Sequence, residues 1–207
     1  MDVKAFANAL YASYRAEVAH RGWQMIQDAE LKNYLWQMAR WATDPCGKCG
    51  LMLTGLYGNG KSTLMFALCS LVSYLYASER LDQEMKFRLM EATEIAEMGS
   101  DESRVKEFKA LINEPLLAID ELGQEAKNII KYGKVYTPIA DLLKERYKRQ
   151  KVTVVCTNLV EQKHRGGQDE KHQIKDHYGE RVVDRLREMM KIIVFTNESY
   201  RNRLKPL

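Results

Sequence analysis

The sequence predicts an α/β protein built on a parallel sheet with helices on both faces. From residue 50 onward, short apolar runs alternate about five times with amphipathic stretches, a pattern typical of strands joined by crossover helices. The runs at 116–119 and 152–156 are almost wholly apolar, as expected of strands buried on both faces. A glycine-rich segment also separates the first expected strand from the first expected helix, as in strand–loop–helix phosphate-binding units.

Two amphipathic helices are expected before the sheet begins. Their apolar residues lie three or four positions apart, in the sets Val3, Phe6, Leu10, Tyr14 and Leu31, Leu35, Met38, Trp41. Asp44 and Pro45 then end the second helix. Because this piece is too short for a core of its own, residues 1–45 are expected to form a helical segment. It would pack on the main domain, residues 46–207, or on a partner.

Strands and helices are then expected to alternate along the main domain. The expected strands are residues 50–54, 87–90, 116–119, 152–156 and 191–195. The expected helices are residues 61–76, a segment capped by Thr93, residues 105–112, a segment opened by Thr137 and Pro138, and residues 180–190. The polar stretch 162–177 is expected to be a surface loop leading into a helix, with solvated histidines at 164, 172 and 177.

Composition indicates a soluble globular protein. Of 207 residues, 45% are hydrophobic and 29% charged, which suits an ordinary core. No apolar run approaches the roughly 20 residues of a membrane helix, and the N-terminus lacks the order of a secretory signal. A cytoplasmic location is therefore expected. The net charge of +4 is weak support for nucleic-acid binding, and the basic cluster at 144–151 fits phosphate contacts or a solvated helix end equally well.

The four cysteines indicate no metal centre. Cys69 and Cys156 lie within helical and strand patterns and are expected to be buried. Cys46 and Cys49 form a lone C-x-x-C, whereas a structural zinc site needs four ligands. A turn before the first strand is expected there.

A phosphate-binding loop is predicted between the first strand and the first helix. The segment reads GLYGNGKST, which matches G-x-x-x-x-G-K-[ST]. The glycines let successive N–H groups turn onto phosphate oxygens, and the following helix adds the positive end of its dipole. Lys61 would reach the terminal phosphates and the Ser62 hydroxyl would ligate Mg²⁺. The nucleotide-binding residues are expected to be Gly55, Tyr57, Gly58, Asn59, Gly60, Lys61, Ser62 and Thr63.

An acidic pair is predicted at the same edge of the sheet. Asp120 and Glu121 directly follow the apolar run 116–119, and ligands bind at the carboxyl ends of strands in open α/β sheets. Asp120 would hold Mg²⁺, directly or through water. Glu121 would orient and activate an attacking water, which favours hydrolysis of a nucleoside triphosphate over transfer to a small molecule.

A polar pair also ends the strand predicted at 152–156. Thr157 and Asn158 follow it and would lie at the edge that carries Asp120. Either side chain could touch the γ-phosphate or the attacking water, and Asn158 is the first choice. A plain turn residue is the alternative, because Asn is common in turns.

Five segments in fixed order resemble a known family. They are 55–63, IDELG at 119–123, CTNL at 156–159, YGERVVDRL at 178–186 and SYR at 199–201. Together they resemble the DnaC/IstB branch of the AAA+ ATPases, which comprises replicative helicase loaders and transposition helper ATPases. The resemblance spans about residues 30–203.

The resemblance implies a five-stranded parallel αβα sandwich with little or no helical lid. It also implies ATP with Mg²⁺ as cofactors and self-association through an interface at the ATP site. There an arginine of one subunit completes the site of the next, a role that falls on Arg185, with Arg181 as runner-up. Arg201 matches a second sensor arginine. Surface salt bridges with Glu180, Asp184 or Glu188 are the alternative for the two helical arginines.

These observations predict an ATPase that acts as a DNA replication accessory protein, with slow hydrolysis serving as a switch in an oligomer. Its expected partners are DNA, in particular single-stranded DNA, and a replicative helicase. Within residues 124–136, lysines alternate with tyrosines, a pairing that suits single strands; a structured loop packed on the core is the alternative. Rival functions are an IstB-like helper of a transposase, a nucleotide-gated protein adaptor without useful hydrolysis, and a small-molecule kinase.

Overall fold

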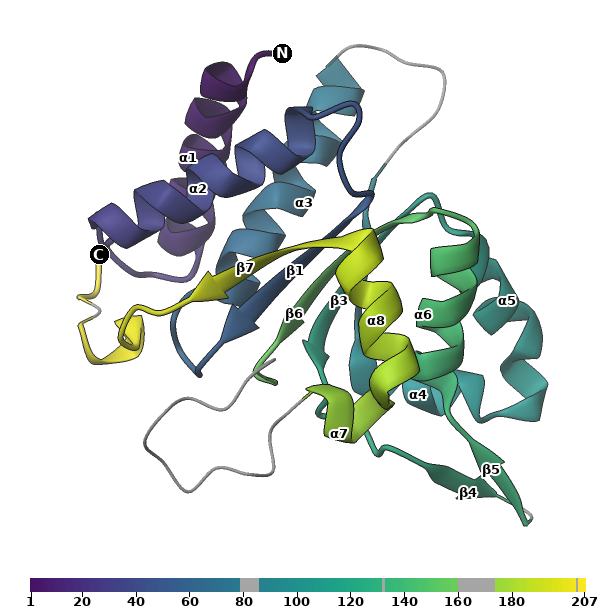
Figure 1. Ribbon diagram of the computed structural model, residues 1–207. Helices are drawn as coiled ribbons and strands as arrows, with labels where there is room; N and C mark the ends of the chain where they lie inside the picture. Colours follow the sequence, from purple (N-terminus) through teal and green to yellow (C-terminus); the bar gives the residue numbers. More distant parts are fainter. Residues whose placement is uncertain (79–85, 132, 160–173, 204) are drawn as a thin grey trace.

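The centre of the molecule is a sheet of five parallel strands in the order β2-β3-β6-β1-β7, with helices on both faces (Figure 1). The structure is a computed structural model that describes residues 1–78, 86–131, 133–159, 174–203 and 205–207. The strands are β1 Gly50–Gly55, β2 Arg88–Glu91, β3 Leu116–Leu122, β6 Val152–Thr157 and β7 Met190–Phe195. The predicted fold class is confirmed. Because β3, β6 and β1 are neighbouring parallel strands, their carboxyl ends meet at one edge.

Three helices cover one face of the sheet: α1 Val3–His20, α2 Ala29–Thr43 and α3 Lys61–Ser78. Leu10, Leu35 and Leu68 from these helices are buried in one core with Leu53 of β1 and Val154 of β6. The two N-terminal helices therefore pack on the sheet-forming part of the chain, one of the two arrangements that the sequence left open. A domain division after residue 45 stays a prediction.

The opposite face carries α4 Ala92–Gly99, α5 Val105–Asn113, α6 Pro138–Lys148 and α8 Glu180–Met189, with the short helix α7 Ile174–Tyr178 beside α8. Ile95, Leu142 and Leu186 bury their side chains there against Ile119 and Val155 of the sheet. This second core completes a three-layer α/β/α sandwich.

The two threonines predicted to begin helices behave differently. The prediction for Thr93 is wrong, because β2 runs directly into α4 and Glu91 takes the N-cap position. Thr137 does precede α6 and Pro138 is its first residue, as predicted. Its hydroxyl, however, lies 3.2 Å from an oxygen of Asp141 and makes no capping bond to the backbone.

Residues 124–136 contain a two-stranded antiparallel hairpin that the sequence did not predict as strands. β4 Ile129–Lys131 pairs with β5 Lys134–Tyr136, and the hairpin projects from the body of the molecule (Figure 1). Three residues a strand are too few for an alternating pattern to stand out. Ile130 and Val135 oppose each other in the register and are 72% and 63% exposed.

The histidines fall into two groups. His177 was expected to be solvated, and this is wrong: its ring is only 17% exposed and its Nε2 lies 3.1 Å from Glu125 Oε1. The loop predicted at residues 162–177 extends too far, because its last four residues belong to helix α7, Ile174–Tyr178. This helix places His177 against the body of the protein. His164 and His172 lie outside the described residues.

The cysteines lie as expected. Cys46 and Cys49 occupy the turn between α2 and β1, where the Cys46 N–H donates to Asp44 Oδ1 at 3.0 Å. Cys69 and Cys156 are buried. Among the helices that the structure describes, none combines the length and the apolar character that a membrane span requires.

A fully buried arginine joins α5, α6 and β6. Arg146 has no exposed surface and donates to Thr153 Oγ1 and to four backbone carbonyls, those of Leu111, Ile112, Glu114 and Val152. Burial lowers the pKa of Arg146 to about 10, so it stays charged at neutral pH. The side chain satisfies carbonyls at the end of α5 that would otherwise be buried without donors.

Replacing Arg146 with Met is expected to lower the free energy of unfolding by about 3 kcal/mol or more, because several buried carbonyls lose their donor. Urea denaturation would measure the change. The matched control is Arg149→Met near the end of the same helix, where an exposed ion pair with Glu145 contributes about 0–1 kcal/mol. Equal losses in the two variants would contradict the structural role of Arg146.

Candidate nucleotide site

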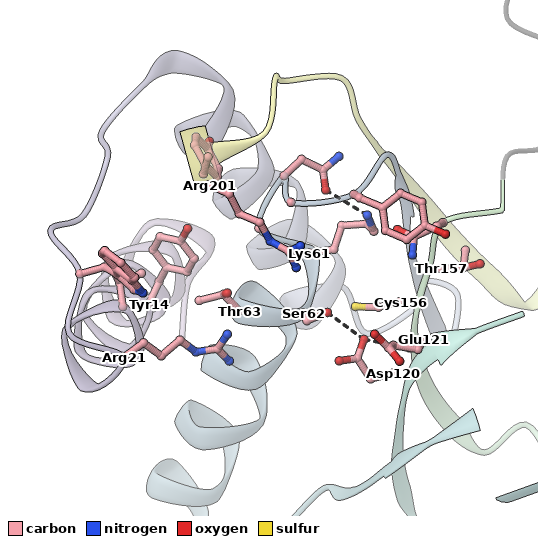
Figure 2. A pocket seen from close by; sticks show the side chains of 18 residues that line it. Tyr14, Arg21, Lys61, Ser62, Thr63, Asp120, Glu121, Cys156, Thr157 and Arg201 are labelled. Atoms are coloured by element: carbon pink, nitrogen blue, oxygen red, sulfur yellow. Dashed lines mark hydrogen bonds between the residues drawn. The ribbon is translucent and has the colours of Figure 1, made fainter. Parts of the chain in front are cut away.

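A cavity of about 450 Å³ lies at the edge where the carboxyl ends of β1, β3 and β6 meet. Residues 57–63 form its floor, Asp120 and Glu121 one wall, and residues 156–158 contribute beside them. α1 and the segment after β7 close the remaining sides (Figure 2). The cavity therefore gathers the predicted loop, the predicted acids and the predicted polar pair in one place.

The loop before α3 adopts a backbone that only glycine accepts easily. Gly55, Gly58 and Gly60 have φ angles of 146°, 77° and 90°. A Cβ on Gly58 would lie 2.2 Å from Ser199 Oγ, and one on Gly55 would lie 2.4 Å from the carbonyl oxygen of Phe195. The glycines thus permit both the turn and the close approach of the segment after β7. Gly55 itself does not line the cavity.

Lys61, the first residue of α3, is held inside the loop. It is only 6% exposed, and its Nζ donates to the carbonyls of Gly55 and Leu56 at 2.8 and 2.6 Å and to Asn59 Oδ1 at 3.0 Å. Burial lowers the pKa of Lys61 to about 8; Cys156 and Asp120 oppose this shift, and Arg201 adds to it. The cation lacks a carboxylate partner among the described residues, so an anion in the cavity would stabilise it.

Ser62 and Asp120 form a pair of oxygen donors. The Ser62 hydroxyl donates to Asp120 Oδ1 at 2.9 Å (Figure 2), and Asp120 is 8% exposed. No ion pair engages Asp120 within the parts of the chain that the structure describes. Hard oxygen ligands of this kind are what Mg²⁺ prefers, so the two residues fit a magnesium site.

A bulge brings Glu121 to the same side of β3 as Asp120. Successive side chains of a regular strand point to opposite faces. Here the register with β6 shifts between Ile119 and Leu122, and Glu121 takes a left-handed φ of 55°. Both acids consequently line the cavity. A non-glycine residue held in this conformation costs about 1 kcal/mol or more and is typical of functional sites.

Thr157 and Asn158 both line the cavity but differ in their availability. The Thr157 hydroxyl donates to the carbonyl of Leu122 at 2.6 Å and accepts from the N–H of Leu159 at 3.0 Å. It therefore stabilises the local backbone. The half-buried Asn158 side chain makes no hydrogen bond within the described residues, which leaves its amide for a ligand.

The three arginines predicted from the family lie in two places. Arg201 lines the cavity, because the 3₁₀ turn Tyr200–Asn202 is tied to the loop by a bond from the Tyr200 N–H to the Gly58 carbonyl at 2.9 Å. Arg181 and Arg185 lie on α8 and do not line the cavity of their own chain. Arg185 sits over the ring of Tyr147, at 5.8 Å from its centroid.

Sequence reasoning missed a wall of the cavity. Tyr14 and Val18 of α1 line it together with Arg21, which directly follows that helix, and with Trp23 and Tyr200. Tyr14 fitted the apolar face of a helix and Tyr200 belongs to the SYR segment at 199–201, whereas no motif marks Val18, Arg21 or Trp23. The Tyr200 hydroxyl donates to Asp28 at 3.0 Å, which ties the C-terminal segment to the N-terminal one. The two ends of the chain thus meet at the cavity, a juxtaposition that no local pattern reveals.

Comparison with known proteins gives structural matches alone. Neither protein-family models nor curated protein sequences match this chain. The DnaC helicase loader matches with a TM-score of 0.60 and 19% identity, over 83% of this chain and 93% of its own. DnaI matches with a TM-score of 0.56 and 18% identity, over 85% of this chain and 86% of its own. AMPPCP-bound DnaA from Aquifex aeolicus matches with a TM-score of 0.52 and 12% identity, over 86% of this chain and 50% of the DnaA chain. The chain therefore has the AAA+ P-loop fold, in the form found in the DnaC helicase loader.

Proposed function

We propose that this protein is an ATPase that assists DNA replication in the manner of a helicase loader, with slow hydrolysis acting as a switch. The observation that carries the proposal is the cavity in which Lys61, Ser62, Asp120, Glu121 and Asn158 converge. Solved structures of the same fold include the DnaC helicase loader, and one DnaA structure contains bound AMPPCP, a nucleotide. Both facts support a nucleotide ligand here.

Each residue has a defined task in the proposed reaction. The loop N–H groups and Lys61 bind the phosphates, and Lys61 exchanges its carbonyl contacts for phosphate oxygens. Ser62 and Asp120 would hold Mg²⁺, which when bound neutralises charge on the β- and γ-phosphates. Glu121 orients the attacking water and accepts its proton, and Asn158 fixes the water or the γ-phosphate.

The arginine of a neighbouring subunit completes this proposed site. Arg185, with Arg181 as the alternative, would offset the charge that develops on the transferred phosphoryl group. Their position on α8, away from the cavity of the same chain, suits a role across an interface. Arg201 would contact the phosphates from within the chain.

The decisive experiment measures ATP turnover per subunit against protein concentration, with and without single-stranded DNA. A shared site makes turnover per subunit rise with concentration. Mixing inactive Lys61→Ala subunits with inactive Arg185→Ala subunits is then expected to restore activity, because one supplies the arginine and the other the nucleotide site. Turnover independent of concentration, together with no restoration, would contradict the shared site. Absence of turnover under every condition would support the nucleotide-gated adaptor.

Nucleotide affinity is expected to fall as the pH rises above about 8. The pKa of Lys61 is about 8 in the free protein, and a bound polyphosphate raises it, since an adjacent anion favours the charged amine. Binding therefore takes up a proton at high pH, and affinity is full below pH 8 and lost by up to tenfold per pH unit above it. Calorimetry in buffers of different ionisation enthalpy would detect this proton. A constant affinity from pH 7 to 9.5 would contradict the contact.

The β4–β5 hairpin is the proposed contact for single-stranded DNA. The sequence holds no acidic residue between Glu125 and Asp141 but three lysines. Replacing Lys131 and Lys134 with Ala is expected to weaken DNA binding and to reduce the slope of log K against log salt by about 1.4, since each phosphate contact contributes about 0.7. Fluorescence anisotropy would measure it. The control, Lys106→Ala with Lys109→Ala on α5, is expected to change neither quantity.

A further inference from the structure

A buried carboxylate stands just beyond the acidic pair of the candidate site. Glu125 is 6% exposed. Its Oε2 accepts from the N–H of Gly123 at 2.9 Å. Its Oε1 contacts His177 Nε2 at 3.1 Å and accepts from the hydroxyl of Tyr178. Three groups from two distant segments therefore meet on one carboxylate.

Together, the hydrogen bonds to Glu125 lower its pKa by more than burial raises it. Burial alone would raise the pKa of Glu125, but the hydrogen bonds from His177, Tyr178 and Gly123 hold it below its usual value. The carboxylate is thus ionised and fully engaged at neutral pH. A second contact joins the same two segments: Lys127 Nζ donates to the carbonyl of Asp176 at 2.7 Å. The segment after β3 is in this way bonded twice to α7.

The end of α7 in turn determines where α8 begins. The Gly179 N–H closes α7 on the carbonyl of Lys175 at 2.8 Å, and the Gly179 carbonyl accepts from the N–H of Val182 at 3.2 Å in the first turn of α8. Gly179 has a φ of 81° at the N-cap, so one tight turn joins the helices. Any shift of His177 and Tyr178 is therefore passed directly to α8, the helix that carries Arg181 and Arg185.

A ligand site is the obvious alternative for this cluster. A second cavity, of about 210 Å³, is lined by Glu125, Lys127 and His177 among others. Both oxygens of Glu125 and the amine of Lys127 already have partners inside the protein. A ligand would have to break these bonds before it could form its own. The contacts hold two segments together and leave the cavity without a free charged group from this pair.

We propose that Glu125, His177 and Tyr178 form a positioning link, which holds α8 so that its arginine reaches the nucleotide site of the neighbouring subunit. The inference rests on the proposed function, because it requires a shared site. The link acts through Arg185 and touches no nucleotide itself.

The test separates two roles that a subunit plays in mixed assemblies. Lys61→Ala subunits supply the arginine and Arg185→Ala subunits supply the nucleotide site. The double change His177→Leu with Tyr178→Phe, which leaves the bond from Gly123 intact, is introduced into one or the other. In the arginine-supplying subunit it is expected to lower the restored turnover about tenfold or more, since small misplacements of a catalytic group have effects of this size. In the nucleotide-binding subunit it is expected to leave turnover within about twofold.

Several outcomes would overturn the link. Equal turnover in all mixtures would show that α8 needs no such anchor. Equal loss in both roles would show a general structural effect. If Lys61→Ala and Arg185→Ala subunits that lack the double change restore no ATP turnover when mixed, the shared site is contradicted. The proposed link is then contradicted with it. Should the double variant not fold, judged by its thermal melt, Tyr178→Phe alone must show the same asymmetry. Lys175→Ala, on the exposed side of α7, is the control and should change neither role.

Discussion

Replacing Glu121 with Gln is expected to abolish ATP turnover, by about 100-fold or more, while nucleotide affinity stays within about twofold. The carboxylate lines the cavity beside Asp120, and within the described residues it makes no hydrogen bond with the loop that would bind phosphate. Gln keeps the size of the side chain and cannot accept a proton. Binding and hydrolysis should therefore separate cleanly in this variant.

Calorimetric titration with ATP and a phosphate-release assay would measure the two quantities on the same preparation. Glu97→Gln, an exposed acid on α4, is the control and is expected to behave like the unmodified protein in both. Turnover above about half the normal rate in Glu121→Gln would contradict its role as general base. Loss of binding in the same variant would show that Glu121 supports the shape of the site instead.

Replacing Lys61 with Ala is expected to weaken nucleotide binding by about 100-fold or more. The change removes a buried cation that fits the terminal phosphates. It also leaves the carbonyls of Gly55 and Leu56 without the donor that Lys61 now provides.

Titration of Lys61→Ala with a fluorescent ATP analogue would measure the effect. Ser62→Ala is the informative companion, because its hydroxyl is bonded to Asp120 and belongs to the proposed metal site. It is expected to lose affinity only when Mg²⁺ is present and to match the unmodified protein in EDTA. An affinity of Lys61→Ala within about threefold of normal would contradict the phosphate-binding loop altogether.

Local features of the chain were enough to predict the class of fold and the centre of the site. Apolar runs mark the inner strands β1, β3 and β6, because a strand buried on both faces needs apolar side chains throughout. The edge strands β2 and β7 also carry exposed residues. The segment from Gly55 to Ser62 is recognisable because its loop must be tight, must expose N–H groups and must end in a helix. Asp120 and Asn158 could be placed at the same edge because parallel strands end together.

Only the tertiary structure decided which distant groups meet at that edge. The bulge that turns Glu121 beside Asp120 arises from pairing with β6. The contacts of Tyr14, Arg21 and Arg201 around the cavity join segments almost 200 residues apart. A sequence pattern reports the preferences of neighbours along the chain, whereas these positions are determined by how two packed cores close on a sheet. For that reason the phosphate loop could be read from residue spacing, and the walls around it and the buried link at Glu125 could not.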